Sequence, residues 1–382
     1  MKKLLLLATL LTCCASLLAQ NTFRIEGTTT YNNPITLYKL PNDFRKDLIE
    51  VPNNPKVKMM QEVKEEVGSV TPENGTFYFT GTYAQPEIYI ISIPTSGSKS
   101  METYFVVDGS SIKVQVTENE IVISNSPLTE KLQSFTSERR LLASKAQPIM
   151  SEMTALGKDA TEEQKNEVRK KFMATQEETS TFIINYAKDN INNIVGQYAL
   201  AQMVDRATPE QLQAVVAEAN QTTLAQPTLK KAAQLLNAHA AVNEGSSFTD
   251  LELVTPEGRK ASLSDYAGRG KYVLIDFWAT WCAPCKKEIP LLVELYNQYK
   301  DKGFEIVGIS LDEKKDDWVK SISEWGMEWV HLSDLKGFRG EAATNYLVKS
   351  IPYTILVDPN GKIIAKGLRG EGLKAKLTEL IK

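Results

Sequence analysis

The sequence predicts a multidomain protein with a β-sandwich-like N-terminal domain, a central α-helical segment and a C-terminal α/β domain. Three observations predict this fold class. Short runs of alternating apolar residues fill residues 20–126, apolar residues recur at helical spacing over 127–245, and strand-like and helix-like segments alternate over 246–382. A chain of 382 residues is long enough for two or three such domains.

The composition is that of an ordinary globular protein, with 42% hydrophobic and 24% charged residues. The formal net charge is −3, and the charged residues form no basic block. We therefore expect no nucleic-acid partner, because proteins that bind nucleic acids gather Lys and Arg on one face or along one stretch.

Residues 1–19 are expected to be a secretory signal peptide. Lys2 and Lys3 form a short positive start, and the apolar run Leu4–Leu18 is too short to span a membrane. Ala19 is a small residue of the kind that precedes a cleavage site. We therefore expect an exported protein, cleaved near Ala19, that works in the periplasm or the cell envelope.

Two cysteines inside this leader raise a rival hypothesis. A bacterial lipoprotein would begin at a lipidated cysteine, and Cys13 or Cys14 could serve as that residue. The preceding Leu11 and Thr12 fit the lipoprotein pattern poorly. Lipid anchoring is therefore the less favoured alternative.

Residues 20–126 are expected to form the short strands of a sandwich or half-barrel. The turn signal at Asn74 and Gly75 precedes the strand-like run Thr76–Phe79, and other segments repeat this pattern. Residues 57–67 mix charged and apolar side chains without a clear period, so we expect a loop or short helix there. No catalytic cluster stands out, which favours a structural or docking module.

Residues 127–245 are expected to form a small bundle of antiparallel helices, since the apolar residues follow a helical period and the intervening loops are short. One helix start is explicit, because Thr208 is a good N-cap and Pro209 suits the first turn. The expected role is a spacer or a dimer surface, so the sequence leaves a homo-oligomer open.

The segment 281–286, which reads WCAPCK, carries the chemistry. It follows the apolar run 272–278 and opens an amphipathic stretch over 284–300, which predicts a strand, a tight turn and a helix. Cys282 and Cys285 then stand on the first helical turn, where unpaired N–H groups and a partial positive charge stabilise a thiolate. A thiolate that forms and breaks a disulfide is a two-electron redox catalyst.

Other interpretations of the cysteine pair fit less well. A zinc site needs about four ligands, and the chain offers only His239 and His331, both distant in sequence, and no second cysteine pair. Haem attachment requires a histidine where Lys286 stands. A purely structural disulfide this short would close almost no loop and add little stability. We therefore expect no metal and no cofactor.

The segment 276–286 closely resembles the active-site segment of the thioredoxin superfamily. Pro290 matches the family's helix-kinking proline, and Ile351-Pro352 matches its cis-proline loop. The helix and strand expected over 316–332 resemble the insertion of the TlpA/ResA-like, exported branch. The resemblance covers residues 248–382. Ahead of it, the β region looks like a bacterial domain of unknown function that precedes such thioredoxin domains.

The resemblance implies roles that physical chemistry supports. Cys282, nearer the helix start, should be the exposed attacking thiolate, and Cys285 the buried thiol that resolves the mixed disulfide. Asp276 lies on the apolar strand, so its carboxyl should be desolvated and its pKa raised into the range useful for proton transfer.

Substrate contacts are implied in the same way. Trp281 offers a flat apolar surface beside Cys282, and Pro352, if cis, would leave the Ile351 backbone free to pair with a client strand. Two departures from the family leave substrate choice open. Ala283 replaces an acid that some ResA-like members carry between the cysteines, and Tyr353 stands where many relatives have threonine.

The leading hypothesis is an exported thiol–disulfide oxidoreductase that reduces protein disulfides with electrons from a membrane thiol donor. Clients would be apocytochrome c, in cytochrome c maturation, or oxidised envelope proteins. The motif does not set the direction of the reaction. A thiol peroxidase is an alternative, but Ala279 stands where its threonine is expected. A non-catalytic scaffold that uses the β and helical regions is another.

Overall fold

The computed structural model describes residues 21–51, 54–95, 100–109, 111–157 and 160–382. These residues form two compact units, one up to Ala233 and one from Gln234 to Lys382. The expected signal peptide, with Cys13 and Cys14, lies outside the described residues. No helix in the described part of the chain is long and apolar enough to cross a membrane.

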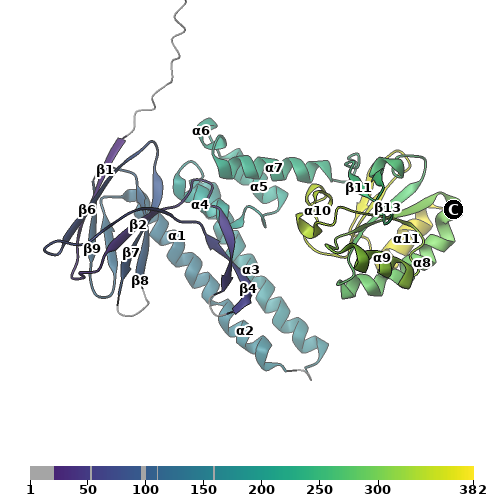
Figure 1. Ribbon diagram of the computed structural model, residues 1–382, viewed down its shortest axis with the longest axis horizontal. Helices are drawn as coiled ribbons and strands as arrows, with labels where there is room; N and C mark the ends of the chain where they lie inside the picture. The colour runs from purple at the N-terminus through teal and green to yellow at the C-terminus, as the bar shows by residue number, and fades with distance from the viewer. Residues whose placement is uncertain (1–20, 52–53, 96–99, 110, 158–159) are drawn as a thin grey trace, which may run out of the picture. The chain divides into compact units, whose positions relative to one another are not determined.

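The first unit begins with two four-stranded sheets that face each other (Figure 1). Their orders are β10-β9-β1-β6 and β5-β2-β7-β8. The strands of the first sheet are β1 (Asn21–Thr28), β6 (Thr76–Tyr83), β9 (Ser111–Val116) and β10 (Ile121–Ser124). Those of the second are β2 (Ile35–Lys39), β5 (Glu65–Val70), β7 (Glu87–Pro94) and β8 (Ser100–Val107).

Alternation of side chains explains why these sheets pack as a sandwich. From Phe23 onward every second residue of β1 is buried, including Phe23 and Ile25. These residues share one apolar core with residues of the second sheet such as Leu37, Ile91 and Phe105. The expected β-sandwich-like architecture is therefore confirmed.

The expectation of a loop or short helix over 57–67 is wrong. This stretch falls in β4 (Asn54–Glu62), which pairs with β3 (Lys46–Val51), and in β5. The pair β3-β4 is a separate two-stranded ribbon, with Met59 and Met60 exposed. A ribbon that belongs to neither sheet is not forced to alternate apolar and polar residues, so its sequence lacks the period-2 signal.

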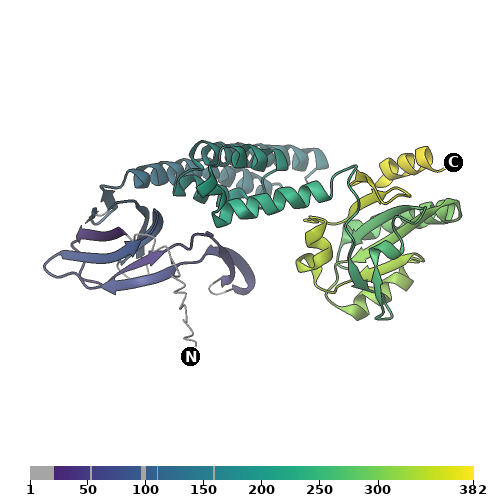
Figure 2. The ribbon, with the colours of Figure 1, turned by 90° about the horizontal axis from the view of Figure 1, so that it is seen from above.

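Helices α1 to α6 and the first half of α7 complete the described part of the first unit, where they lie to one side of its strands (Figure 2). Their bounds are α1 (Pro127–Ser144), α2 (Ala146–Ala155), α3 (Glu162–Asn190), α4 (Ile194–Met203), α5 (Pro209–Ala217), α6 (Gln221–Leu224) and α7 (Pro227–Ala241). Helices α1 and α2 pack against α3. Thr208 caps α5 as expected, with Pro209 in its first turn.

The sheets and the helices of this unit pack against one another. Helix α1 lies against β8. The Glu62 carboxylate at the end of β4 accepts hydrogen bonds from the hydroxyls of Tyr104 on β8 (3.0 Å) and Tyr198 on α4 (2.9 Å). The division into a β-rich domain over 20–126 and a helical region over 127–245 thus stays a prediction.

The second unit is built on a seven-stranded mixed sheet of order β12-β11-β15-β14-β13-β16-β17. Its strands are β11 (Glu252–Val254), β12 (Lys260–Ser262), β13 (Tyr272–Trp278), β14 (Phe304–Ser310), β15 (Val330–Ser333), β16 (Tyr353–Val357) and β17 (Ile363–Lys366). Its helices are η1 (Leu263–Asp265), α8 (Ala283–Tyr299), η2 (Lys300–Lys302), α9 (Lys315–Glu324), η3 (Gly337–Arg339), α10 (Glu341–Asn345) and α11 (Gly370–Leu380).

Strand β13 is the centre of this sheet. It pairs in parallel with β14 and antiparallel with β16. Six of its seven residues are buried whichever face they point to, so both faces of the sheet are covered. The expected mixed α/β domain ending in a hairpin, β16-β17, is confirmed.

Candidate active site

The candidate active site is the junction of β13 and α8. Cys282 is the N-cap of α8, and its sulfur accepts a hydrogen bond from the backbone N–H of Cys285 (3.1 Å). The two cysteines form a disulfide with their Cα atoms 5.2 Å apart. Pro284 fits the first turn because no N–H is needed there. The sulfur of Cys282 therefore lies where helix N–H groups favour negative charge.

The expectation that Cys282 is exposed is wrong for this oxidised state. Its exposed fraction is 4%, close to the 2% of Cys285. As N-cap, its side chain turns back over the first helical turn and bonds to the inner cysteine, which removes it from solvent. The neighbouring Trp281, by contrast, is 59% exposed.

Asp276 is buried in β13, two residues before Trp278, and its side chain is on the same face of the strand as that tryptophan. Burial raises its pKa to about 7, and the nearby Glu288 carboxylate adds to the rise. The expected desolvation is therefore confirmed. A carboxyl with a pKa near neutrality can both accept and return a proton at physiological pH.

Glu288 was not predicted from the sequence. It lies on α8 three residues after Cys285, is half-buried, and accepts a hydrogen bond from the Gly370 N–H at the start of α11 (3.1 Å). The signal was available, because residues three apart lie on one helical face. Glu288, about one turn beyond Cys285, therefore lies on the same side of α8 as the buried cysteine.

The proline loop reaches the same end of the sheet. The Ile351–Pro352 peptide is cis, as expected. It directly precedes β16, whose first residue Tyr353 pairs with Phe277 near the end of β13. Both Ile351 and Pro352 are half-buried. The register of β13 and β16 thus places this loop and the Cys-bearing turn at the same end of the sheet, where β13 ends and β16 begins.

Trp278 is fully buried, as expected of a core residue, and its ring contacts those of Trp325 and His331. Burial lowers the pKa of His331 to about 4, so this histidine is a neutral core residue at physiological pH. Among the described residues, no group of three or more His, Cys, Asp or Glu side chains could hold a metal.

An exposed aromatic pair borders the site. Among the described residues of the second unit, the large apolar side chains more than a third exposed are Trp281, Phe338 (42%) and Val319 (36%). The rings of Trp281 and Phe338 lie 6.0 Å apart. Phe338 belongs to η3, some 50 residues beyond the cysteines, so no local sequence pattern predicts its place beside Trp281.

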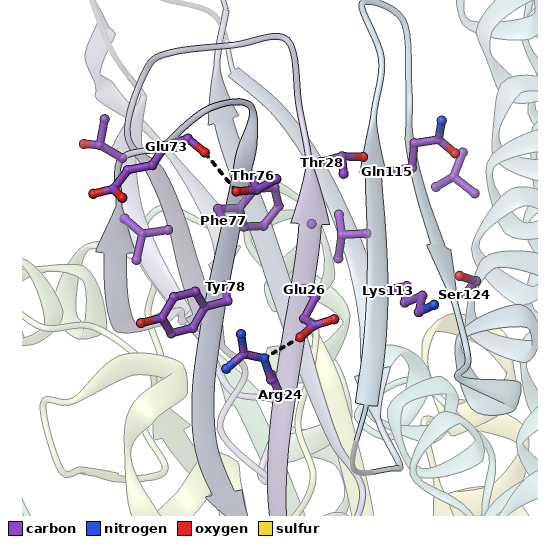
Figure 3. A pocket seen from close by; sticks show the side chains of 15 residues that line it. Arg24, Glu26, Thr28, Glu73, Thr76, Phe77, Tyr78, Lys113, Gln115 and Ser124 are labelled. Atoms are coloured by element: carbon purple, nitrogen blue, oxygen red, sulfur yellow. Dashed lines mark hydrogen bonds and ion pairs between the residues drawn. The ribbon is translucent and has the colours of Figure 1, made fainter.

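A further cavity lies on the first sheet of the first unit (Figure 3). Its volume is about 860 Å³, and Tyr78, Arg24, Glu26 and Lys113 help to line it. The Arg24 guanidinium stacks 4.4 Å from the centre of the Tyr78 ring and pairs with Glu26. The cavity contains no cysteine or histidine, so it has no part in thiol chemistry.

Comparison with known proteins agrees with this geometry. Residues 245–366 match the AhpC/TSA family, and residues 23–132 match a domain of unknown function, DUF4369. The thiol-disulfide oxidoreductase ResA of Bacillus thuringiensis subsp. konkukian is 38% identical over 126 residues, which are 33% of this chain and 69% of that protein. ResA of Geobacillus thermodenitrificans is 35% identical over 131 residues, 34% of this chain and 72% of that protein.

Solved structures give similar matches. The thioredoxin domain of a thiol-disulfide oxidoreductase from Bacteroides vulgatus is 38% identical, with 37% of this chain and 99% of that chain covered and a TM-score of 0.35. A thiol-disulfide oxidoreductase from Bacteroides fragilis is 36% identical over 36% of this chain and 100% of its own, with a TM-score of 0.34.

The second unit has the α/β fold of a thioredoxin-like domain, with a disulfide-bonded cysteine pair at the start of α8. Through this unit the chain belongs to the ResA-like thiol-disulfide oxidoreductases. Proteins of this class act on disulfide-bearing proteins.

The raised pKa of Asp276 gives a first prediction. The folded protein holds this proton up to about pH 7, whereas an unfolded aspartate releases it near 3.8. Folding stability should therefore fall as pH rises between these values, by on the order of 4 kcal/mol at 1.36 kcal/mol per pH unit. Asp276→Asn should remove this loss, so the oxidised variant should be more stable than the parent at pH 8 and similar near pH 4.

The measurement is urea unfolding followed by tryptophan fluorescence, because all five tryptophans belong to the second unit. Glu328→Gln is the control, since that carboxylate is mostly exposed and its loss should not give a pH-dependent gain. If Asp276→Asn is less stable than the parent at pH 8, the assigned desolvation is wrong.

Proposed function

We propose that the protein is an exported reductase of protein disulfides. The observation that carries the proposal is the cysteine pair at the start of α8, followed by a partly buried glutamate and preceded by a buried aspartate with a pKa of about 7. This combination supplies a stabilised thiolate, a resolving thiol and a proton acceptor. Cys282 and Cys285 form the redox-active disulfide, and Asp276 is the third catalytic residue.

The reaction has two exchange steps. The Cys282 thiolate attacks one sulfur of the client disulfide, a mixed disulfide forms, and the other client sulfur leaves as a thiolate that takes up a proton. Cys285 then gives its proton to Asp276 and attacks the Cys282 sulfur. The Cys282–Cys285 disulfide forms, and the second client thiolate leaves. Asp276 then passes its proton to that thiolate. The client has gained two electrons from the cysteine pair, one proton from Cys285 through Asp276, and one from solvent, which had received the Cys282 proton when the thiolate formed.

Asp276 and Glu288 act on the second step. A thiol is a poor nucleophile until its proton is removed, and Cys285 is buried. Asp276, with its pKa near neutrality, is present in substantial part as the carboxylate that accepts this proton. Glu288 raises that pKa and so keeps the carboxylate basic enough for the transfer.

The client binds beside the exposed aromatic pair and the proline loop. Trp281 provides an apolar contact next to Cys282, and Ile351 and Pro352 offer backbone for an extended client segment. Tyr353 and Ala283, which depart from the common pattern of the family, adjust the choice of client. Disulfide-bearing envelope proteins and apocytochrome c, during cytochrome c maturation, have the required chemistry.

The cellular setting follows from the leader and the cysteine content. Residues 1–19 direct export to the periplasm or cell envelope, and lipid anchoring through Cys13 or Cys14 is the less favoured form. A membrane thiol donor re-reduces the Cys282–Cys285 pair. Residues 20–245, a β-rich domain over 20–126 and a helical region over 127–245, present the enzyme to its clients or join copies into a homo-oligomer.

A trapping experiment tests the reductase proposal. With Cys285→Ser the mixed disulfide cannot be resolved, so the reduced variant should accumulate a covalent adduct with insulin. Non-reducing electrophoresis should show this adduct, and dithiothreitol should abolish it. Cys282→Ser is the matched control and should form none. Catalysed insulin reduction by Cys282→Ser, or equal adducts from both variants, would contradict the assigned roles.

The aromatic pair gives a second prediction under this proposal. Phe338→Ala should raise KM for insulin about fivefold, the effect of losing roughly 1 kcal/mol of apolar contact. The rate with a small disulfide, such as 2-hydroxyethyl disulfide, should stay unchanged because it is too short to contact Cys282 and Phe338 at once. Val319→Ala, an exposed apolar side chain on α9, is the control. An equal loss with both substrates would remove Phe338 from the client surface.

A binding or scaffold role of the first unit is the second candidate function. The open cavity of about 860 Å³ on its sheet favours it, since a mixed polar and aromatic hollow is suited to a ligand. This candidate predicts that wild-type protein does not reduce insulin and that Cys285→Ser traps nothing. A thiol peroxidase remains disfavoured, because Ala279 replaces the threonine that it would need.

A further inference from the structure

The loop between β13 and α8 donates hydrogen bonds to the side chain of Asp312, which belongs to neither element. Both carboxylate oxygens of Asp312 accept the backbone N–H of Thr280 (3.1 Å each), and Oδ1 also accepts the Thr280 hydroxyl (2.7 Å). Thr280 stands two residues before Cys282. Asp312, which lies 32 residues after Thr280, thus holds the turn that leads to Cys282.

The Asp312 side chain is itself firmly placed. It is only 2% exposed, and its second oxygen accepts the Ser310 hydroxyl (2.8 Å). The Asp312 N–H in turn donates to the Ser310 Oγ (3.0 Å). The intervening Leu311 N–H donates to the carbonyl of Trp278 at the end of β13 (2.8 Å). The carboxylate is therefore built into the end of β14, next to the strand that leads to the cysteines.

This arrangement satisfies a backbone group that secondary structure leaves unpaired. Thr280 belongs neither to β13 nor to α8, and a buried N–H without a partner is costly. The Cys282 N–H closes the same turn by donating to the Ala279 carbonyl (3.1 Å). Asp312 and this internal bond together define the path of the chain into α8.

The contact matters most after reduction. In the oxidised protein the bond to Cys285 holds the Cys282 sulfur at the helix start. Once that bond is broken, the position of the sulfur depends on the backbone of the preceding turn and on the Cys285 N–H. A thiolate that drifts from the helix N-terminus loses the N–H groups and the dipole that stabilise it.

We propose that Asp312 is a positioning residue of the redox site, which holds the Thr280 turn so that reduced Cys282 stays at the N-terminus of α8. The inference rests on the proposed reductase function. Asp312 acts by fixing the geometry of the turn through hydrogen bonds that an asparagine at position 312 can largely replace.

Three variants test the proposal: Asp312→Ala, Asp312→Asn and Tyr346→Phe. The last removes a buried 2.6 Å hydrogen bond to the Thr249 carbonyl and leaves the Thr280 turn untouched, so it controls for lost stability alone. Two readouts are used: the rate constant for insulin reduction and the pH dependence of Cys282 alkylation in a Cys285→Ser background.

Asp312→Ala should slow insulin reduction about 10- to 100-fold, the range expected when a reacting group is displaced by about 1 Å. The midpoint of alkylation should move to higher pH. Asp312→Asn should keep most of the wild-type rate and midpoint, and Tyr346→Phe should change neither. An Asp312→Ala variant with wild-type rate and midpoint overturns the inference, and so does an Asp312→Asn variant as impaired as Asp312→Ala.

A milder variant of the same contact tests the proposal even if Asp312→Ala folds poorly. Thr280→Val removes only the hydroxyl bond, and it should lower the rate and raise the midpoint less than Asp312→Ala but in the same direction. An unchanged midpoint in Thr280→Val contradicts the inference. The wild-type protein separates the two proposals, because its failure to reduce insulin would reject the reductase function itself and not the role of Asp312.

Discussion

The second unit depends on one interaction: a cysteine sulfur placed against the unpaired N–H groups of a helix that starts where a buried strand ends. The Cys285 N–H donates to the Cys282 sulfur, and α8 begins there because Cys282 takes the N-cap position. Strand β13 holds Cys282 in this position because it is hydrogen-bonded to a strand on each side, β14 and β16, and nearly all of its side chains are buried. Rigid placement of the sulfur is thus a consequence of sheet register.

The same buried strand creates the second condition of the site. A carboxyl on β13 has no access to solvent, so its charged form is disfavoured and its pKa rises towards neutrality. The energetic cost of placing Asp276 there opposes folding at physiological pH, and an apolar residue would fill the position without it. Such a cost at the centre of a domain is typical of groups that serve chemistry.

Most features of the cysteine site were predictable from the sequence. The uninterrupted apolar run 272–278 predicted a fully buried strand, and the spacing of the cysteines predicted their place on one helical turn. Burial of Asp276 followed from its position inside that run. The β3-β4 ribbon was missed because a two-stranded ribbon outside the sheets imposes no alternation on its side chains.

Other features of the site depend on contacts that the sequence does not encode locally. Asp312 and Phe338 reach the Cys-bearing turn only through the packing of β14 and η3 in the folded domain. The burial of Cys282 reflects the direction of its side chain within the disulfide, which spacing alone does not give. Glu288 could have been found from helical periodicity, since it follows Cys285 by three residues.

The reduction potential of the Cys282–Cys285 pair decides in which direction electrons flow between this pair and a client disulfide. The mature protein would be equilibrated with thiol–disulfide buffers of defined potential, and the reduced fraction measured by alkylation. A reductase that receives electrons from a dedicated thiol donor should have a reduction potential of about −270 mV, as thioredoxin does. A value of about −120 mV, as in the strong oxidant DsbA, would contradict the reductase function and indicate an enzyme that introduces disulfides.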